Sequence, residues 1–250
     1  MIDIVEPAEV FTAGEYAQRG REVLREIAGR GRIPLVCGGT GFYLRALLEG
    51  LFPGPRRRED IRAALAQRER QRPGSLHRIL TRLDLYSASK IHANDVNKTI
   101  RALEVRLLER KPISELFREG RESLLGFDTI KIGLDPERDK LYERINARTA
   151  AMFEHGLIDE VRQILFRGVS GSAKPFESLG YKQALAVVRG ELAYPDAVAH
   201  TQIETRRYAK RQMTWFRRER DVQWFPGFGD DADIKNAVHT QLMQRLSHKS

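Results

Sequence analysis

The sequence is poor in cysteine and has no long apolar segment. Its one cysteine, Cys37, cannot form a disulfide within the chain, and no Cys/His group has the spacing of zinc ligands. No apolar run is long enough to cross a bilayer, and Met1–Pro7 lacks the basic and then apolar pattern of a secretory signal. These absences exclude a disulfide-stapled secreted domain, a zinc-binding domain and a membrane-spanning protein, and we expect a cytoplasmic protein.

Residue patterns for nucleophilic catalysis are also missing. The six histidines are scattered, and none lies near a serine or cysteine as a nucleophile–base pair would require. We therefore assign no catalytic histidine and no metal ligand. What is present is a 250-residue chain with 41% hydrophobic and 31% charged residues, enough for one large domain or two small ones.

The positive charge of the chain, +9 in total, is concentrated near residues 201–220, where seven Lys/Arg stand against two acids. On a helix, the residues from 206 to 218 separate into two arcs. We call one of them the basic arc: Arg206, Arg207, Lys210, Arg211, Thr214, Arg217 and Arg218. The opposite arc consists of Tyr208, Ala209, Gln212, Met213, Trp215 and Phe216 and is expected to pack on the protein. A solvated charged face is one interpretation of the basic arc, but six like charges repel each other, which favours contact with a phosphate backbone.

A glycine-rich turn, Gly38–Gly41, follows an apolar segment, Ile33–Cys37, that we predict to be a strand. An amphipathic helix follows the turn, and its free N–H groups suit an anion. The glycines allow a ligand to approach the backbone, and Thr40 adds a hydroxyl. The alternative is an ordinary strand–turn–helix joint capped by Thr40.

The remaining pattern predicts three regions along an α/β chain. Residues 1–55 form the first part of an α/β core, with a helix over Glu15–Ala28 capped by Thr12 or Gly14. After a Pro/Gly/Arg-rich break at residues 52–58, residues 56–122 are expected to form a helical insertion, with Asn94 or Asp95 capping one helix.

Residues 123–250 are expected to complete the core. The pattern predicts a strand over 129–134, helices over 137–153, 157–166 and 195–219, a helix that follows residues 176–182 and ends at 188, a short apolar stretch at 222–225 and a last helix. Arg144 and Arg148 are one helical turn apart and could clamp a pyrophosphate, or could form surface ion pairs.

Six short motifs follow one another along nearly the whole chain. They are Gly38-Gly39-Thr40, the helix end Leu47–Leu51, Ile91–Asp95, Ile100–Val105, Gly180-Tyr181-Lys182 and Lys210–Arg217. In sequence and in order they resemble the bacterial tRNA dimethylallyltransferases (tRNA isopentenyltransferases). The resemblance implies a P-loop-NTPase-like core with a parallel sheet and a helical insertion domain. It also implies transfer of a dimethylallyl group from its diphosphate to N6 of adenosine 37, in tRNAs that read codons beginning with U.

The resemblance also implies roles for particular residues. Thr40 matches a catalytic threonine near the target adenosine, and Arg148 matches a catalytic arginine that holds the diphosphate. Arg62 matches a tRNA contact of the insertion. Lys182 stands where many relatives have arginine, which keeps the charge but not the bidentate geometry. Three further tRNA-contacting segments are implied: Asn97, Lys98, Thr99, Ile100 and Arg101; Glu177, Ser178, Leu179, Gly180, Tyr181 and Lys182; and Lys210, Arg211, Gln212, Met213, Thr214, Trp215, Phe216 and Arg217.

One departure from the family pattern is large. The family's P-loop, Gly-x-x-x-x-Gly-Lys-Ser/Thr, and the aspartate that acts as general base have no counterpart, since no Gly-Lys-Ser or Gly-Lys-Thr occurs in the chain. Mg²⁺ is a family expectation whose ligands are not in this chain. We therefore expect an N-terminally incomplete core and a chain that is inactive, or nearly so, by itself.

The partners expected from the resemblance are the tRNA anticodon stem–loop and dimethylallyl diphosphate, and we expect a monomer that does not bind membranes. Two other functions stay open. One is a tRNA-binding protein without catalysis. The other is an isopentenyltransferase for adenine nucleotides, which would need neither the basic arc nor the helical insertion.

Overall fold

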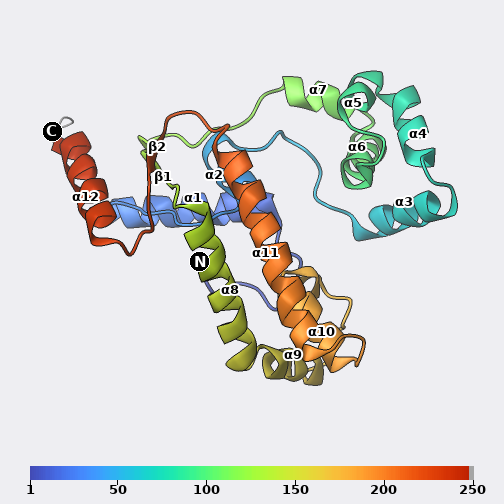
Figure 1. Ribbon diagram of the computed structural model, residues 1–250. Helices are drawn as coiled ribbons and strands as arrows, with labels where there is room; N and C mark the ends of the chain where they lie inside the picture. Colours follow the sequence, from blue (N-terminus) through green and yellow to red (C-terminus); the bar gives the residue numbers. More distant parts are fainter. Residues whose placement is uncertain (248–250) are drawn as a thin grey trace. The chain divides into compact units, whose positions relative to one another are not determined.

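Helices dominate the structure, a computed structural model that describes residues 1–247 (Figure 1). Two units can be distinguished by their internal contacts. The first unit comprises Met1–Tyr16, Val23–Leu44 and the chain from Gly126 onward, and the second comprises Ala17–Glu22 and Arg45–Leu125. The predicted domain boundaries at residues 55 and 122 stay predictions.

The first helix begins where the sequence places its cap. Helix α1 (Ala13–Gly29) starts after Thr12, whose hydroxyl accepts a hydrogen bond from the Glu15 amide at 3.2 Å. The Glu15 carboxylate in turn accepts one from the Thr12 amide at 2.8 Å. This reciprocal pair satisfies two N–H groups that a helix start leaves free, which confirms Thr12 as the cap.

The first unit contains a short parallel sheet. Strand β1 (Lys131–Leu134) pairs with β2 (Val222–Phe225), with Lys131 opposite Val222 and Leu134 opposite Phe225. Both strands lie where the sequence has alternating or apolar residues, so the strand predicted within 129–134 is confirmed. The pairing brings together residues about ninety positions apart, as parallel strands with a long connection do.

Helices between and after the strands build the core of the first unit. They are α8 (Arg138–Glu154), α9 (Leu157–Phe166), the 3₁₀ turn η1 (Lys174–Glu177), α10 (Tyr181–Val188), α11 (Tyr194–Phe216) and α12 (Ala232–Ser247). Helix α9 has the bounds that the sequence predicts, and α11 runs beside α8 (Figure 1). The buried core is apolar and consists of Phe153, Leu157, Val161, Phe176, Ala184, Leu185 and Ala197.

The prediction of a strand over Ile33–Cys37 is wrong. These residues are irregular, and Ile33 and Leu35 are 63% and 77% exposed. A strand needs a hydrogen-bonded neighbour, and within residues 1–247 β1 and β2 pair only with each other. The apolar, β-branched composition of the segment therefore does not suffice, although the helix predicted after it, α2 (Gly41–Glu49), does form.

The second unit is helical between residues 59 and 118, as predicted. It contains α3 (Glu59–Gln71), α4 (Ser75–Leu83), α5 (Leu85–Lys90), α6 (Val96–Glu109) and α7 (Ile113–Arg118). Asp95 caps α6 by accepting a hydrogen bond from the Lys98 amide at 3.1 Å, which decides between Asn94 and Asp95. The core residues are Leu76, Leu80, Ala88, Ile100, Ala102, Leu103, Val105, Ile113 and Leu116.

A buried carboxylate, Asp84, ties the ends of three of these helices together. It follows α4 and accepts hydrogen bonds from the amide and hydroxyl of Ser87 at the start of α5, at 3.0 and 2.7 Å. It also accepts from the amide and hydroxyl of Ser114 in α7, at 3.2 and 2.8 Å. Burial by itself would raise the pKa of the Asp84 carboxyl, but these hydrogen bonds outweigh burial and lower the pKa below its ordinary value.

Asp84→Asn should lower the free energy of unfolding by about 2–4 kcal/mol, because an amide NH₂ cannot accept the hydrogen bonds that one carboxylate oxygen accepts. Asp60→Asn is the control, since Asp60 is an exposed carboxylate of the same unit, and it should leave stability almost unchanged. Urea unfolding of the three proteins measures both effects.

The difference between wild type and Asp84→Asn should also depend on pH with a defined sign. Because the folded-state pKa of Asp84 lies below the unfolded value of about 3.9, its stabilisation is fully present above that value. It is lost as the pH falls through the folded-state pKa. The gap should therefore be constant from about pH 7 to about pH 5 and narrow only below about pH 4; a gap that widens on acidification would contradict the lowered pKa.

Candidate nucleic-acid interface

The glycine turn contacts helix α11 directly, and both belong to the first unit. The Gln212 side-chain amide donates a hydrogen bond to the Gly39 carbonyl at 2.8 Å. A Cβ added to Gly39 would overlap that amide, and a Cβ added to Gly41 would overlap the indole of Trp215. Gly41 is thus required by the close approach of a bulky ring, whereas a Cβ at Gly39 would meet the movable end of Gln212. The contact places the exposed Thr40 beside the end of α11.

The basic arc of α11 lies at the surface, as predicted, with one exception. Arg207, Lys210, Arg211, Arg217 and Arg218 are exposed, whereas most residues of the opposite arc are half-buried. The exception is Arg206, which donates a hydrogen bond to the Asn146 side chain at 2.5 Å and lies over the ring of Tyr142. The exposed cations near the glycine turn form a surface suited to a phosphate backbone.

A cavity of about 230 Å³ lies against the same helix at the carboxyl end of β1. Within it, Arg217 contacts the Asp135 carboxylate at 3.1 Å, and Arg138 donates to the Tyr142 hydroxyl at 3.1 Å. The sequence patterns did not reveal this grouping, and the Arg138/Tyr142 spacing of four was the available signal. The lining residues are Asp135, Pro136, Arg138, Leu141, Tyr142, Lys210, Met213, Thr214 and Arg217.

The two arginines that could have formed a clamp on α8 have different environments. Arg144 donates to both oxygens of Asp230, at 2.7 and 2.9 Å, and stacks on the ring of Phe228 at 3.7 Å. Arg148 is exposed and has no hydrogen bond or ion pair within residues 1–247. The ion-pair interpretation therefore holds for Arg144, and only Arg148 retains all its donors for an anion.

The segment Glu177–Lys182 joins η1 to α10. Gly180 has a φ of +89°, which favours glycine, and its amide donates to Gln183 at 3.0 Å. The Tyr181 hydroxyl donates to Glu160 at 2.5 Å, and burial together with this bond raises the pKa of Tyr181 to about 12. Of the segment, Glu177, Ser178 and Lys182 are exposed.

Two of the predicted RNA contacts of the second unit are held by one acid, and a third, Lys98, pairs with Asp95 at 2.6 Å. Arg62 on α3 and Arg101 on α6 contact Glu104 at 3.3 and 2.7 Å. Asn97 and Lys98 are exposed, whereas Thr99 and Ile100 are buried, so those two side chains serve the core. Sequence analysis missed Glu104, although the spacing of three from Arg101 indicated the pair.

Metal-binding clusters and membrane spans are both missing from the described part of the chain. No group of three or more His, Cys, Asp or Glu residues within residues 1–247 could hold a metal ion. In the same range no helix is long and apolar enough to span a membrane. No cluster of side chains within these residues could therefore hold Mg²⁺ through protein ligands alone.

Comparison with known proteins gives consistent matches over almost the whole length. Residues 1–219 match the family model described as IPP transferase. The chain is 57% identical over 246 residues to the tRNA dimethylallyltransferase of Solibacter usitatus, an alignment that covers 98% of this chain and 80% of that protein. It is 55% identical over 236 residues to that of Koribacter versatilis, which covers 94% and 76%.

Solved structures agree. The crystal structure of the full-length tRNA isopentenylpyrophosphate transferase of Bacillus halodurans matches with a TM-score of 0.67 and 34% identity, covering 99% of this chain and 78% of that one. A eukaryotic dimethylallyltransferase acting on tRNA matches with a TM-score of 0.76 and 23% identity, covering 96% and 64%. The second likeness concerns the fold alone.

Gly41→Ala should displace the Trp215 indole from the glycine turn, because the added Cβ overlaps the ring. Overpacking of this kind costs about 1–3 kcal/mol. The fluorescence of Trp215 reports the displacement when Trp224, the other tryptophan, is replaced by phenylalanine in all proteins compared. We expect emission at longer wavelength for Gly41→Ala. Gly38→Ala is the matched control, since a Cβ at Gly38 meets open space, and identical spectra for both variants would contradict the contact.

Proposed function

The chain belongs to the IPP transferase family, and from this premise we propose that it transfers a dimethylallyl group to tRNA. The donor is dimethylallyl diphosphate and the acceptor is N6 of adenosine 37, in tRNAs that read codons beginning with U. The N6 lone pair forms a bond to the allylic carbon, the bond from that carbon to the diphosphate oxygen breaks, and the amine loses a proton to water. The diphosphate leaves with the electron pair.

The observation that carries this proposal is the contact of the glycine turn with the end of α11. A loop base can be read by a protein only when it is unstacked, and phosphate contacts fix its register. The turn offers backbone without side chains and the Thr40 hydroxyl. The basic arc, which lies on the helix that Gln212 joins to the turn, offers cations for the adjoining phosphates. An acceptor adenine beside Thr40 and a backbone along the arc satisfy both requirements.

The other proposed RNA contacts are argued from their exposure and charge. Lys182 and Lys98 are exposed cations, and Arg62 and Arg101 are partly exposed guanidiniums with N–H donors left for phosphate. We propose that these side chains contact the backbone of the anticodon stem–loop. A tRNA substrate fits a cytoplasmic protein.

Arg148 is the proposed ligand of the diphosphate in this chain. Its guanidinium is exposed and unpaired within the described residues, so no ion pair has to be broken for it to bind. Mg²⁺ is proposed to accompany the diphosphate and to neutralise its charge when bound. In this proposal Arg148 holds the diphosphate, and the adenine lies beside Thr40.

A transfer assay tests the proposed reaction. The chain is incubated with an anticodon stem–loop and dimethylallyl diphosphate labelled in the allylic group, and the label in RNA is measured. The control stem–loop carries guanosine in place of adenosine 37, which has no N6 amine. Label in the first RNA alone supports the proposal and contradicts the expectation, drawn from the missing P-loop, that the chain is inactive by itself. Tight binding of the stem–loop without transfer would favour the RNA-binding function without catalysis.

The two proposed substrate sites should separate by mutation. Arg148→Ala should weaken binding of dimethylallyl diphosphate about tenfold and leave stem–loop affinity unchanged, with Arg148→Lys in between because it keeps charge but not the fork geometry. The double variant Lys210→Ala, Arg211→Ala should weaken stem–loop binding and leave the affinity for dimethylallyl diphosphate unchanged. It should also reduce the slope of log K against log salt by about 0.7–0.9 per lost phosphate contact.

Isothermal titration at several salt concentrations measures both affinities of each variant. Arg162→Ala is the control, since Arg162 is an exposed arginine on α9 outside the proposed contacts. A uniform loss in all variants would contradict the assignment.

A further inference from the structure

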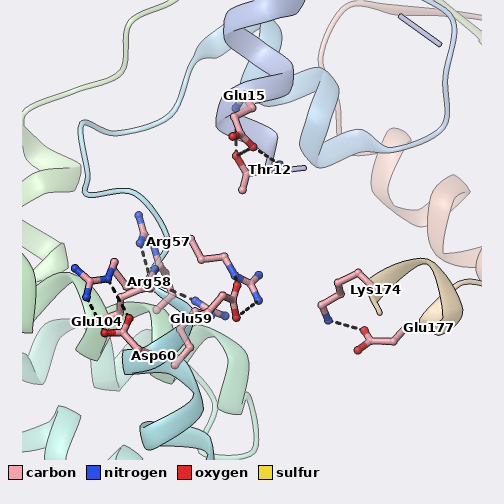
Figure 2. A network of polar contacts seen from close by, with 11 residues as sticks. Thr12, Glu15, Arg57, Arg58, Glu59, Asp60, Glu104, Lys174 and Glu177 are labelled. Atoms are coloured by element: carbon pink, nitrogen blue, oxygen red, sulfur yellow. Dashed lines mark hydrogen bonds and ion pairs between the residues drawn. The ribbon is translucent and has the colours of Figure 1, made fainter. Parts of the chain in front are cut away.

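The side chain of Glu104, on α6, is completely buried, with 0% of it exposed. One of its oxygens accepts from Arg101 at 2.7 Å and from Arg62 at 3.3 Å. The other accepts from the Arg58 amide at 2.8 Å. One buried acid thus joins α3, α6 and the chain that enters α3 (Figure 2).

We propose that Glu104 is a positioning residue for RNA binding, which holds Arg62 and Arg101 so that their remaining N–H groups face a phosphate. This inference rests on the proposed function and extends it to a residue that would not touch the RNA. Arg62 spends one of its five N–H donors on Glu104, and Arg101 spends one on Glu104 and one on the Pro55 carbonyl at 3.0 Å. Both arginine side chains stay partly exposed, at 15% and 30%.

The charges explain why an acid is needed at this point. Two guanidiniums that share one site repel each other, and each long side chain has many rotamers. The carboxylate between them offsets the repulsion and selects one arrangement, while the group retains a net charge of +1. Since a phosphate is an anion, a group of two arginines and one acid still attracts it.

The same carboxylate fixes the path of the Pro/Gly/Arg-rich segment. It accepts from the Arg58 amide, and Arg101, which it holds, also bonds Pro55 and lies 5.8 Å from the ring centre of Phe52. Beside this anchor, Arg57 pairs with Glu59 and Arg58 with Asp60 (Figure 2). The orientation of the arginines and the course of residues 52–58 therefore depend on one side chain.

Glu104→Gln distinguishes positioning from charge, because the two predict opposite signs. The variant removes a negative charge near RNA, so charge alone predicts tighter binding of an anticodon stem–loop. Positioning predicts binding weakened about five- to tenfold, since the glutamine NH₂ group cannot accept a hydrogen bond from a guanidinium or from the Arg58 amide. Binding is measured with the full chain at fixed salt.

Two matched variants show what loss of charge alone and loss of stability alone do to the affinity. Glu59→Gln removes an exposed negative charge from the same region and should leave affinity unchanged or slightly tighter. Asp84→Asn weakens the same helical unit without touching an arginine and should leave the affinity of the folded protein unchanged. Circular dichroism at the binding temperature establishes that each variant is folded.

A double-mutant cycle completes the test. In a chain with Arg62→Ala and Arg101→Ala no guanidinium is left to position, so Glu104→Gln should cause no further loss of affinity. Two results would overturn this inference and leave the proposed function standing. One is unchanged or tighter binding by Glu104→Gln, and the other is an equal loss of affinity in the chain that lacks Arg62 and Arg101. A wild-type chain that binds no stem–loop overturns the proposed function and this inference with it.

Discussion

The close approach of α11 to the glycine turn is the constraint on which the first unit's interface depends. Side chains of α11 make this contact, and they can lie against the backbone of the turn only where the turn itself carries no side chain. Gly39 and Gly41 provide that gap, and Gln212 and Trp215 fill it. With these two side chains directed at the turn, the helical period turns the lysine and arginines of the basic arc away from the core.

Helix α11 therefore has two functions, which belong to different sets of its side chains. Its apolar and amide side chains fix its position, and its exposed cations, of which Lys210 is one, are available to a ligand. The lack of a side chain at Gly39 and Gly41 allows Gln212 and Trp215 to pack against the turn. Thr40, between them, is held beside the cations without taking part in the contact.

The basic residues of the first unit differ in the partners that they already have in the structure. Arg144 is engaged by Asp230 and an aromatic ring, and Arg206 by Asn146, so both belong to the architecture of the first unit. Arg148 and Lys210 have no such partner within residues 1–247. Arg217 lies between these cases: its pair with Asp135 is exposed, exposed pairs contribute little stability, and a phosphate can therefore replace the carboxylate.

Local patterns in the sequence predicted local features well. Capping by Thr12, the bounds of α9 and the two arcs of α11 depend on residues within one or two helical turns of each other, which a sequence displays. The strand predicted over Ile33–Cys37 failed because a strand depends on a partner elsewhere in the chain. Arg144 was ambiguous for the same reason, since its partner Asp230 is 86 residues away. Composition showed that cations were present but not which of them were already bound.

The two buried acids of the helical unit show how the same chemical group takes different roles. Asp84 is surrounded by neutral donors, amides and hydroxyls at helix ends, and every hydrogen bond it accepts fixes the ends of these helices. Glu104 accepts one backbone bond and otherwise holds two cations whose outer edges reach solvent. A buried ion pair is seldom more stable than apolar residues of the same volume, so stability is a weak reason to keep Glu104. Orientation of the arginines is the stronger reason, because an apolar side chain could fill the space but could not direct a guanidinium.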